Sequence, residues 1–171
     1  MAEKKKQKFT KDIVPENFTL SLVLVDALPV IFFGASAVVI SFIFGSKLFL
    51  VGALLCLLGG IGKVLWKMIV VLKKKNVWAM FVQMRILMPL GFLLIIVSLI
   101  FNSSSVSFTG MWNAFISMPS FIFFFIGIIG ICLMIYFSKN LDSGDVKANW
   151  IEQLTNGISQ AAIFVGLLLL L

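Results

Sequence analysis

Five charged side chains lie inside long apolar stretches of this sequence, where an ionised group is costly and usually functional. They are Asp26, Lys63, Lys67, Arg85 and Glu152. Counted along helices that rise about 1.5 Å per residue, all five fall within roughly 15 Å of one membrane face. Ammonium and guanidinium groups bind carboxylates and phosphates. These residues at one shared depth therefore predict a site for an anionic or zwitterionic ligand.

A stripe of neutral amides accompanies the charged residues near the end of the chain. After Asn149, polar side chains recur at Gln153, Asn156 and Gln160, with spacings of three and four residues that place them on one helical face. Amides facing lipid would be unsatisfied, so we expect this face to line a cavity or to contact other helices. We include Gln153, Asn156 and Gln160 in the predicted ligand site.

Each of these residues also has a structural interpretation. Lys67 can extend to the membrane surface, Glu152 can cap the start of its helix, and Arg85 can form a purely structural ion pair. The amide stripe can equally hold helices together through hydrogen bonds. An isolated carboxylate in a membrane is strongly disfavoured, so we expect Asp26 to lie within ion-pair reach of Lys63 or Arg85.

The sequence offers little for catalysis. It contains no histidine, which excludes a histidine general base and histidine-ligated metals. Its two cysteines, Cys56 and Cys132, lie in apolar stretches without a CxxC pattern. The segment 59–63 resembles a phosphate-binding loop, but it lacks the required first glycine and the following Ser or Thr. We predict no catalytic residue, no metal and no cofactor, and enzyme activity is not favoured.

The composition points to a protein that resides in a membrane. Hydrophobic residues make up 61% of the 171 residues, charged residues only 12%, and the mean hydropathy is +1.12. A helix needs about 20 mostly apolar residues to span a bilayer. The sequence therefore predicts an all-α integral membrane protein, a bundle of five transmembrane helices over residues 18–44, 48–72, 77–101, 119–137 and 150–171.

The placement of lysines predicts the orientation of the bundle. Lysines gather in the basic segment 1–17, in the turn 73–76 and in the connection 138–149, whereas the loop 102–113 is uncharged. Cytoplasmic segments carry the excess of Lys and Arg. We therefore expect a cytoplasmic tail at 1–17 and a single membrane domain at 18–171, with the N-terminus in the cytoplasm and the C-terminus outside.

Three functions are compatible with this pattern. The favoured one is a small transporter, or a component of one, with a cytoplasm-facing polar cavity for a small anionic or zwitterionic solute. The alternative is a structural or regulatory subunit that binds a partner helix or an inner-leaflet lipid, and the third is a lipid-modifying enzyme. We expect anionic inner-leaflet lipids, and a second copy or another membrane protein, as partners, with no role for nucleic acid. The thirteen lysines against one arginine suggest a bacterial cell membrane.

Overall fold

The computed structural model describes Val14 and residues 18–101, 108–141 and 145–170. These residues are almost entirely helical, and no strand occurs among them. The helices are α1 Leu20–Phe44, α2 Lys47–Lys73, α3 Trp78–Phe101, α4 Phe108–Ile116, α5 Ser120–Asn140 and α6 Val146–Leu168. The all-helical prediction is confirmed. The predicted tail 1–17 lies outside the described residues, apart from Val14.

Short polar segments set the helix boundaries. Gly45 adopts a left-handed conformation (φ 59°) that ends α1, and the Ser46 side chain then caps α2. The hydroxyl groups of Ser46 and Ser98 lie 2.7 Å apart, which joins the start of α2 to the end of α3. Asp145 caps α6, so this helix begins at Val146, before the predicted span over 150–171.

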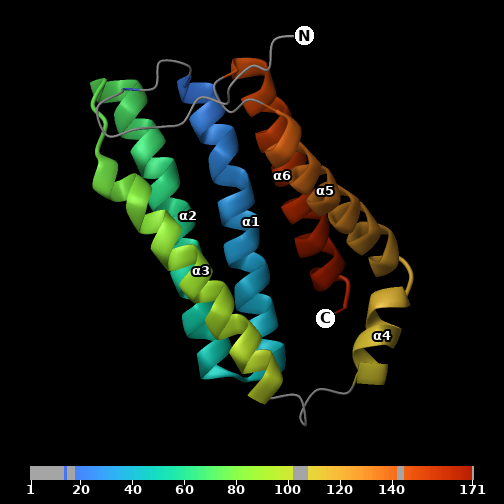
Figure 1. The fold of residues 1–171 in the computed structure, drawn as a ribbon. Coiled ribbons are helices and arrows are strands. Elements are labelled where there is room, and N and C mark those ends of the chain that lie inside the picture. The colour runs from blue at the N-terminus through green and yellow to red at the C-terminus, as the bar shows by residue number, and fades with distance from the viewer. Residues whose placement is uncertain (1–13, 15–17, 102–107, 142–144, 171) are drawn as a thin grey trace.

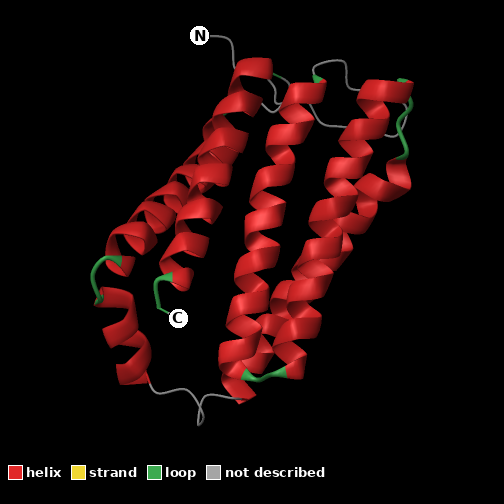
Figure 2. Ribbon diagram, turned by 180° about the vertical axis from the view of Figure 1, so that it is seen from behind, coloured by secondary structure: helices red, strands yellow, loops and turns green. Residues whose placement is uncertain are grey.

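Helix α1 lies between two helix pairs. It contacts α2 on one side and α6 on the other, while α2 packs on α3 and α6 packs on α5. Helices α3 and α5 make no contact with each other in the described part of the chain. Figures 1 and 2 show α5 leaning away from α1 as the two helices approach the end opposite the chain's N-terminus. The bundle is therefore open between α3 and α5.

Glycines allow the helices within each pair to approach closely. A Cβ atom on Gly91 of α3 would lie 2.6 Å from the carbonyl oxygen of Gly52 on α2. In the second pair, Gly130 of α5 faces Ser159 of α6, and the Ser159 hydroxyl donates to the Gly127 carbonyl at 3.3 Å. Backbone contacts of this kind are typical of helix packing in membranes.

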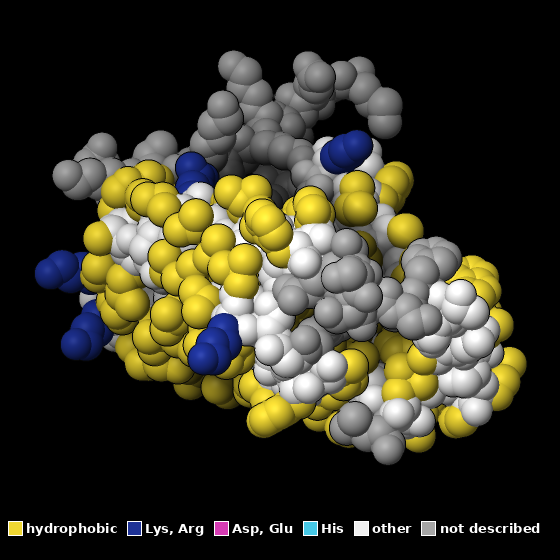
Figure 3. All heavy atoms as spheres, turned by 90° about the horizontal axis from the view of Figure 1, so that it is seen from below, with side chains coloured by type: hydrophobic (Ala, Val, Ile, Leu, Met, Phe, Trp, Pro, Cys, Tyr) yellow, Lys and Arg dark blue, Asp and Glu magenta, His cyan; other side chains and the backbone are white. Residues whose placement is uncertain are grey.

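The outer surface of the bundle is apolar. Many large hydrophobic side chains are exposed, among them Phe42 (82%) and Phe101 (79%). Figure 3, viewed from the end opposite the chain's N-terminus, shows hydrophobic side chains with scattered Lys or Arg and no visible Asp or Glu. Such a surface would aggregate in water but suits lipid. Helices α1, α2, α3 and α5 are long and apolar enough to cross a membrane, which indicates a membrane-embedded protein.

The structure differs from the sequence prediction in two elements. Residues 108–116 form the short helix α4, where an irregular loop over 102–113 is predicted. In the described residues, four helices have the hydropathy of a membrane span, and α6 is not one of them. Its first half is rich in polar side chains, which lowers its mean hydropathy. The fifth span and the orientation of the bundle therefore stay predictions.

Candidate functional site

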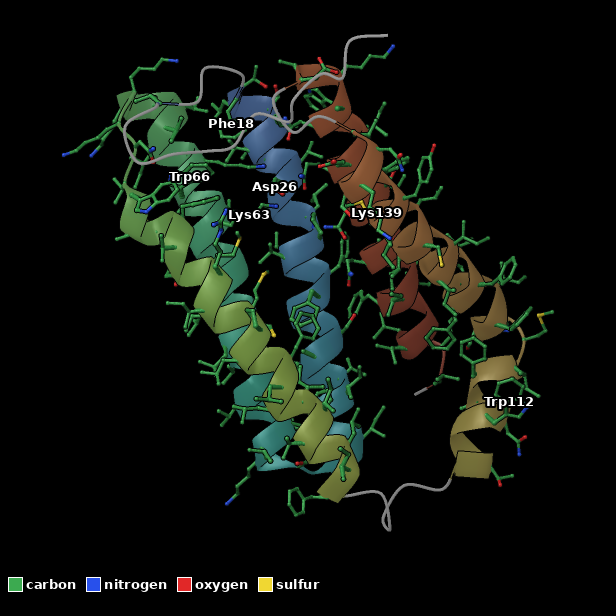
Figure 4. The ribbon with its side chains drawn as sticks, viewed as in Figure 1. Phe18, Asp26, Lys63, Trp66, Trp112 and Lys139 are labelled. Carbon is green, nitrogen blue, oxygen red and sulfur yellow. The ribbon has the colours of Figure 1, made fainter. Side chains whose placement is uncertain are left out.

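The carboxylate of Asp26 is held by two lysines from the neighbouring helix. Asp26 Oδ1 accepts a hydrogen bond from Lys63 Nζ at 3.0 Å, and Asp26 Oδ2 lies 2.7 Å from Lys67 Nζ. Lys63 and Lys67 are one helical turn apart on α2, so both reach the same point on α1. Figure 4 shows Asp26 and Lys63 directed toward each other across the α1–α2 contact. The predicted ion pair with Lys63 is confirmed.

Lys67 lies on the buried side of this cluster, next to Phe18, which we call the closed side. It is only 4% exposed, and its Nζ lies 5.0 Å from the centre of the Phe18 ring, within range of a cation–π interaction. The Phe18 ring packs edge-on against Trp66, which is 1% exposed. Glu152 of α6 adds a favourable electrostatic interaction with Lys67. Lys67 therefore points into the bundle and does not extend to the membrane surface.

An aromatic layer closes the bundle above the ion pair, at the end that carries the start of α1. Its buried residues are Phe18, Leu22, Trp66, Val70 and Phe81. Trp66 Nε1 donates to Asn76 Oδ1 at 2.9 Å, which ties this layer to the α2–α3 turn. The aromatic layer covers Asp26, which is 1% exposed, at the end where the sequence predicts an opening to the cytoplasm.

Lys63 faces a polar pocket below the aromatic layer. Its side chain is 28% exposed, and it borders a pocket of about 160 Å³. The wall of this pocket is mostly apolar, and its polar lining residues are Asp26, Lys63, Asn156 and Gln160. An ammonium group has three N–H donors. Among the described residues only Asp26 Oδ1 accepts from Lys63, so two of these donors remain for a bound molecule.

Of the four amides in the α6 stripe, two are buried away from the polar pocket and two border it. Asn149 donates to the Asp145 carbonyl at the start of the helix, and Gln153 is buried outside the polar pocket. Asn156 and Gln160 are half-buried and border it, and no described residue hydrogen-bonds to either side chain. These two amides are therefore available to a ligand.

A larger apolar groove adjoins the polar pocket. The apolar groove holds about 690 Å³, and it shares Phe33, Phe92, Asn156 and Gln160 with the polar pocket. Its remaining lining residues are Ser36, Ala37, Ile40, Phe49, Ala53, Ile95, Ile131, Met134, Ile135, Ser138 and Ile163. These residues come from α1, α2, α3, α5 and α6, so the apolar groove lies where α3 and α5 fail to meet. The polar pocket and the wide apolar groove thus adjoin each other at these four shared side chains.

Arg85 does not join the cluster. Its side chain is exposed on α3, with the guanidinium 4.5 Å from the centre of the Phe81 ring. Gln83 of the same helix packs over Gly62 of α2. The structure does not bring Arg85 to the pocket that Asp26 and Lys63 border, because α3 presents Gln83 to α2.

The predicted residues thus separate into three groups. Asp26, Lys63, Asn156 and Gln160 come together at the polar pocket. Lys67, Glu152 and Gln153 lie on the closed or packed side and do not border it, and Arg85 lies outside the bundle core.

Sequence reasoning missed the aromatic layer and the apolar groove. The only sequence signal for the layer is the recurrence of Phe18, Trp66 and Phe81 near one end of successive helices. Apart from Asn156 and Gln160, the groove residues are mostly apolar and do not differ from ordinary lipid-facing residues, so the sequence contains no signal for them.

Comparison with models of protein families, with curated proteins and with solved structures finds no match to this chain.

Proposed function

We propose that this chain is a multi-pass protein of a bacterial cell membrane that binds one amphiphilic molecule and serves as a component of its transport. The polar end of the molecule lies at Lys63, Asn156 and Gln160, and its apolar part fills the apolar groove. In this proposal the chain spans the membrane five times, with its N-terminus in the cytoplasm.

One observation carries the proposal. The pocket with unused hydrogen-bond donors and the apolar groove share four lining residues, so a single molecule can occupy both. Ligand sites in proteins typically hold about 300–1,000 Å³ and combine apolar walls with a few polar groups. The apolar groove, at about 690 Å³, falls within this range.

The opening between α3 and α5 supports entry from the bilayer. The aromatic layer covers the polar pocket at the end of the bundle, so the route that α3 and α5 leave open is the lateral one. An amphiphile dissolved in the membrane reaches the groove by this route without crossing water. This lateral route favours a membrane-dissolved ligand over a water-soluble solute.

The alternative function is a structural subunit in which a helix of a partner protein fills the same groove. Asn156 and Gln160 distinguish the two functions because they face the shared part of the space. Leucine is well tolerated in membrane helices, so replacing these amides with leucine should remove their hydrogen bonds to a ligand without disturbing α6.

The experiment compares the Asn156→Leu, Gln160→Leu double variant with wild type and with Thr155→Leu. Thr155 is half-buried on the same helix and borders neither part of the space, so it controls for added bulk. Each protein is purified in mild detergent, and co-purifying small molecules are identified by native mass spectrometry. We expect wild type and Thr155→Leu to retain an amphiphile, and the double variant to lose it without a change in thermal stability.

Two results contradict the proposal. Equal retention by all three proteins would show that the amides do not contact the ligand. Loss of thermal stability in step with loss of ligand would assign the amides to helix packing and support the structural subunit.

A further inference from the structure

The charge at the polar pocket is set by Lys63. Asp26 is the only acidic residue among those that border it, and both of its carboxylate oxygens already face lysines. Lys67, which pairs with Asp26, and Glu152 do not border the polar pocket. The groups available to a ligand are therefore the remaining N–H donors of Lys63 and the amides of Asn156 and Gln160. This arrangement attracts a negatively charged hydrogen-bond acceptor.

The size of the polar pocket limits the group that it accepts. An engineered protein cavity of about 150 Å³ holds one benzene molecule, and the polar pocket is of similar size, about 160 Å³. A carboxylate or phosphate group fits such a space. A compact head is therefore the group that the polar pocket accommodates.

The direction of the apolar groove fits a long chain that lies parallel to the helices. Along α1, the polar pocket includes Asp26, and the apolar groove extends to Ile40. Fourteen residues of helix separate these two positions, a rise of about 21 Å. A bound chain would thus run from its head toward the far side of the membrane, as a lipid of the leaflet at the α1 N-terminus does.

We infer that the bound molecule is an acidic amphiphile with one long apolar chain and a compact oxyacid head, a carboxylate or a phosphate, whose oxygens accept hydrogen bonds from Lys63, Asn156 and Gln160. This inference rests on the proposed function and adds the class of ligand. Carboxylate and phosphate share the required chemistry, and the two are separated by the probes below.

The experiment measures the affinity of the full-length protein in phosphatidylcholine nanodiscs for four probes with the same chain. The probes are hexadecanoate, hexadecyl phosphate, hexadecanol and hexadecyltrimethylammonium, measured at alkaline pH so that the acids are ionised. We expect at least one acid to bind about tenfold or more tightly than hexadecanol, the advantage of a charge-assisted hydrogen bond over a neutral one. The better of the two acids identifies the head.

Three variants connect this selectivity with Lys63. In Lys63→Met the acids should lose their advantage over hexadecanol, while hexadecanol still binds. Lys63→Arg should keep the advantage because it keeps the charge. Arg85→Gln, which removes an exposed cation outside the pocket, should behave as wild type.

The outcomes separate this inference from the function on which it rests. Equal binding of acid and alcohol, or preferential binding of the ammonium probe, would overturn the acidic head while leaving the amphiphile site intact. Absence of binding for all four probes would overturn the acidic amphiphile and the proposed site together. The comparison among probes uses the wild-type protein, so it stands even where a Lys63 variant does not fold.

Discussion

Asp26 and its two lysines bind the first two helices together through charge. Removing one partner of a buried ion pair leaves an uncompensated charge, whereas replacing the whole group with apolar side chains is often neutral. Asp26 is 1% exposed and Lys67 4% exposed, so neither can regain solvation by a small movement. Lys63 keeps partial access to the pocket, and its replacement should disturb the fold less.

We predict that Asp26→Asn lowers the free energy of unfolding in detergent by about 3–5 kcal/mol. Lys67→Met should have a similar effect, and Lys63→Met a smaller one. The triple variant Asp26→Leu, Lys63→Met, Lys67→Met should recover most of the loss because no buried charge remains. Arg85→Gln is the matched control, with an expected change of at most about 1 kcal/mol from the lost cation–π contact.

An unfolding midpoint that stays at the wild-type value in Asp26→Asn would show that the carboxylate is not the counter-charge of the lysines. An Arg85→Gln variant as unstable as Asp26→Asn would restore Arg85 to the cluster.

The sequence predicted the Asp26–Lys63 pair because a buried carboxylate needs a cation at its own depth, and depth follows from counting residues. It did not predict the direction of Arg85. Helix α3 is apolar on all sides, so nothing in its pattern distinguishes the face that carries Arg85 from the face that carries Gln83. The contact of Gln83 with Gly62 depends on packing between two helices, which a single helix pattern does not contain.

At the scale of helices, close backbone contacts fix the geometry of each pair. Gly91 and Gly52 bring the α2 and α3 backbones together at their crossing point. Gly157 of α6 is different, because a Cβ there would lie 3.8 Å from Leu28 and 3.9 Å from Pro29, which are ordinary contact distances. Gly91 and Gly157 thus differ in their tolerance to an added methyl group.

We predict that Gly91→Ala destabilises the protein by about 1–3 kcal/mol, the usual effect of overpacking. The added methyl group would collide with the Gly52 carbonyl and with Cys56, and backbone cannot move aside as a flexible side chain can. Gly157→Ala is the control, and it should leave stability unchanged or raise it slightly because alanine favours helix. Thermal unfolding in detergent measures both, and equal stability of the two variants would contradict the close α2–α3 crossing.

Helix boundaries were predictable where a helix begins and ends with an apolar stretch of the sequence. The predicted spans 18–44, 48–72 and 77–101 agree with α1 to α3 within two residues. Helix α4 was missed because nine residues are too few to span a bilayer, and α6 begins early because the Asp145 cap, not hydropathy, starts it. The apolar groove was not predictable, since it results from two distant helices that do not meet.

At the scale of the whole molecule, lysine placement predicts which end faces the cytoplasm, and this is testable on cells. Lys75 is exposed in the turn between α2 and α3, and Thr109 is exposed on α4 near the opposite end. We predict that Thr109→Cys reacts with a membrane-impermeant maleimide on intact cells, and that Lys75→Cys reacts only after permeabilisation. Both are placed in a Cys56→Ala, Cys132→Ala background, which should itself remain unlabelled.

A reporter fused after Leu171 tests the fifth span in the same cells. The five-span prediction places this reporter outside, and a cytoplasmic signal would show that α6 does not cross. Reversed labelling of Thr109 and Lys75 would overturn the orientation.

The lack of contact between α3 and α5 has a further consequence for affinity. An apolar space open to a bilayer is filled by acyl chains whenever no other molecule occupies it, so a ligand enters by exchange with lipid. The hydrophobic effect then contributes little to the net affinity, because apolar surface is covered before and after the exchange. In the proposed function, selectivity must come from the head, where Lys63, Asn156 and Gln160 would meet either the ligand or the headgroup of an ordinary lipid. The apparent affinity that we expect is therefore a property of the protein and the surrounding membrane together, and it should shift when the lipid composition changes.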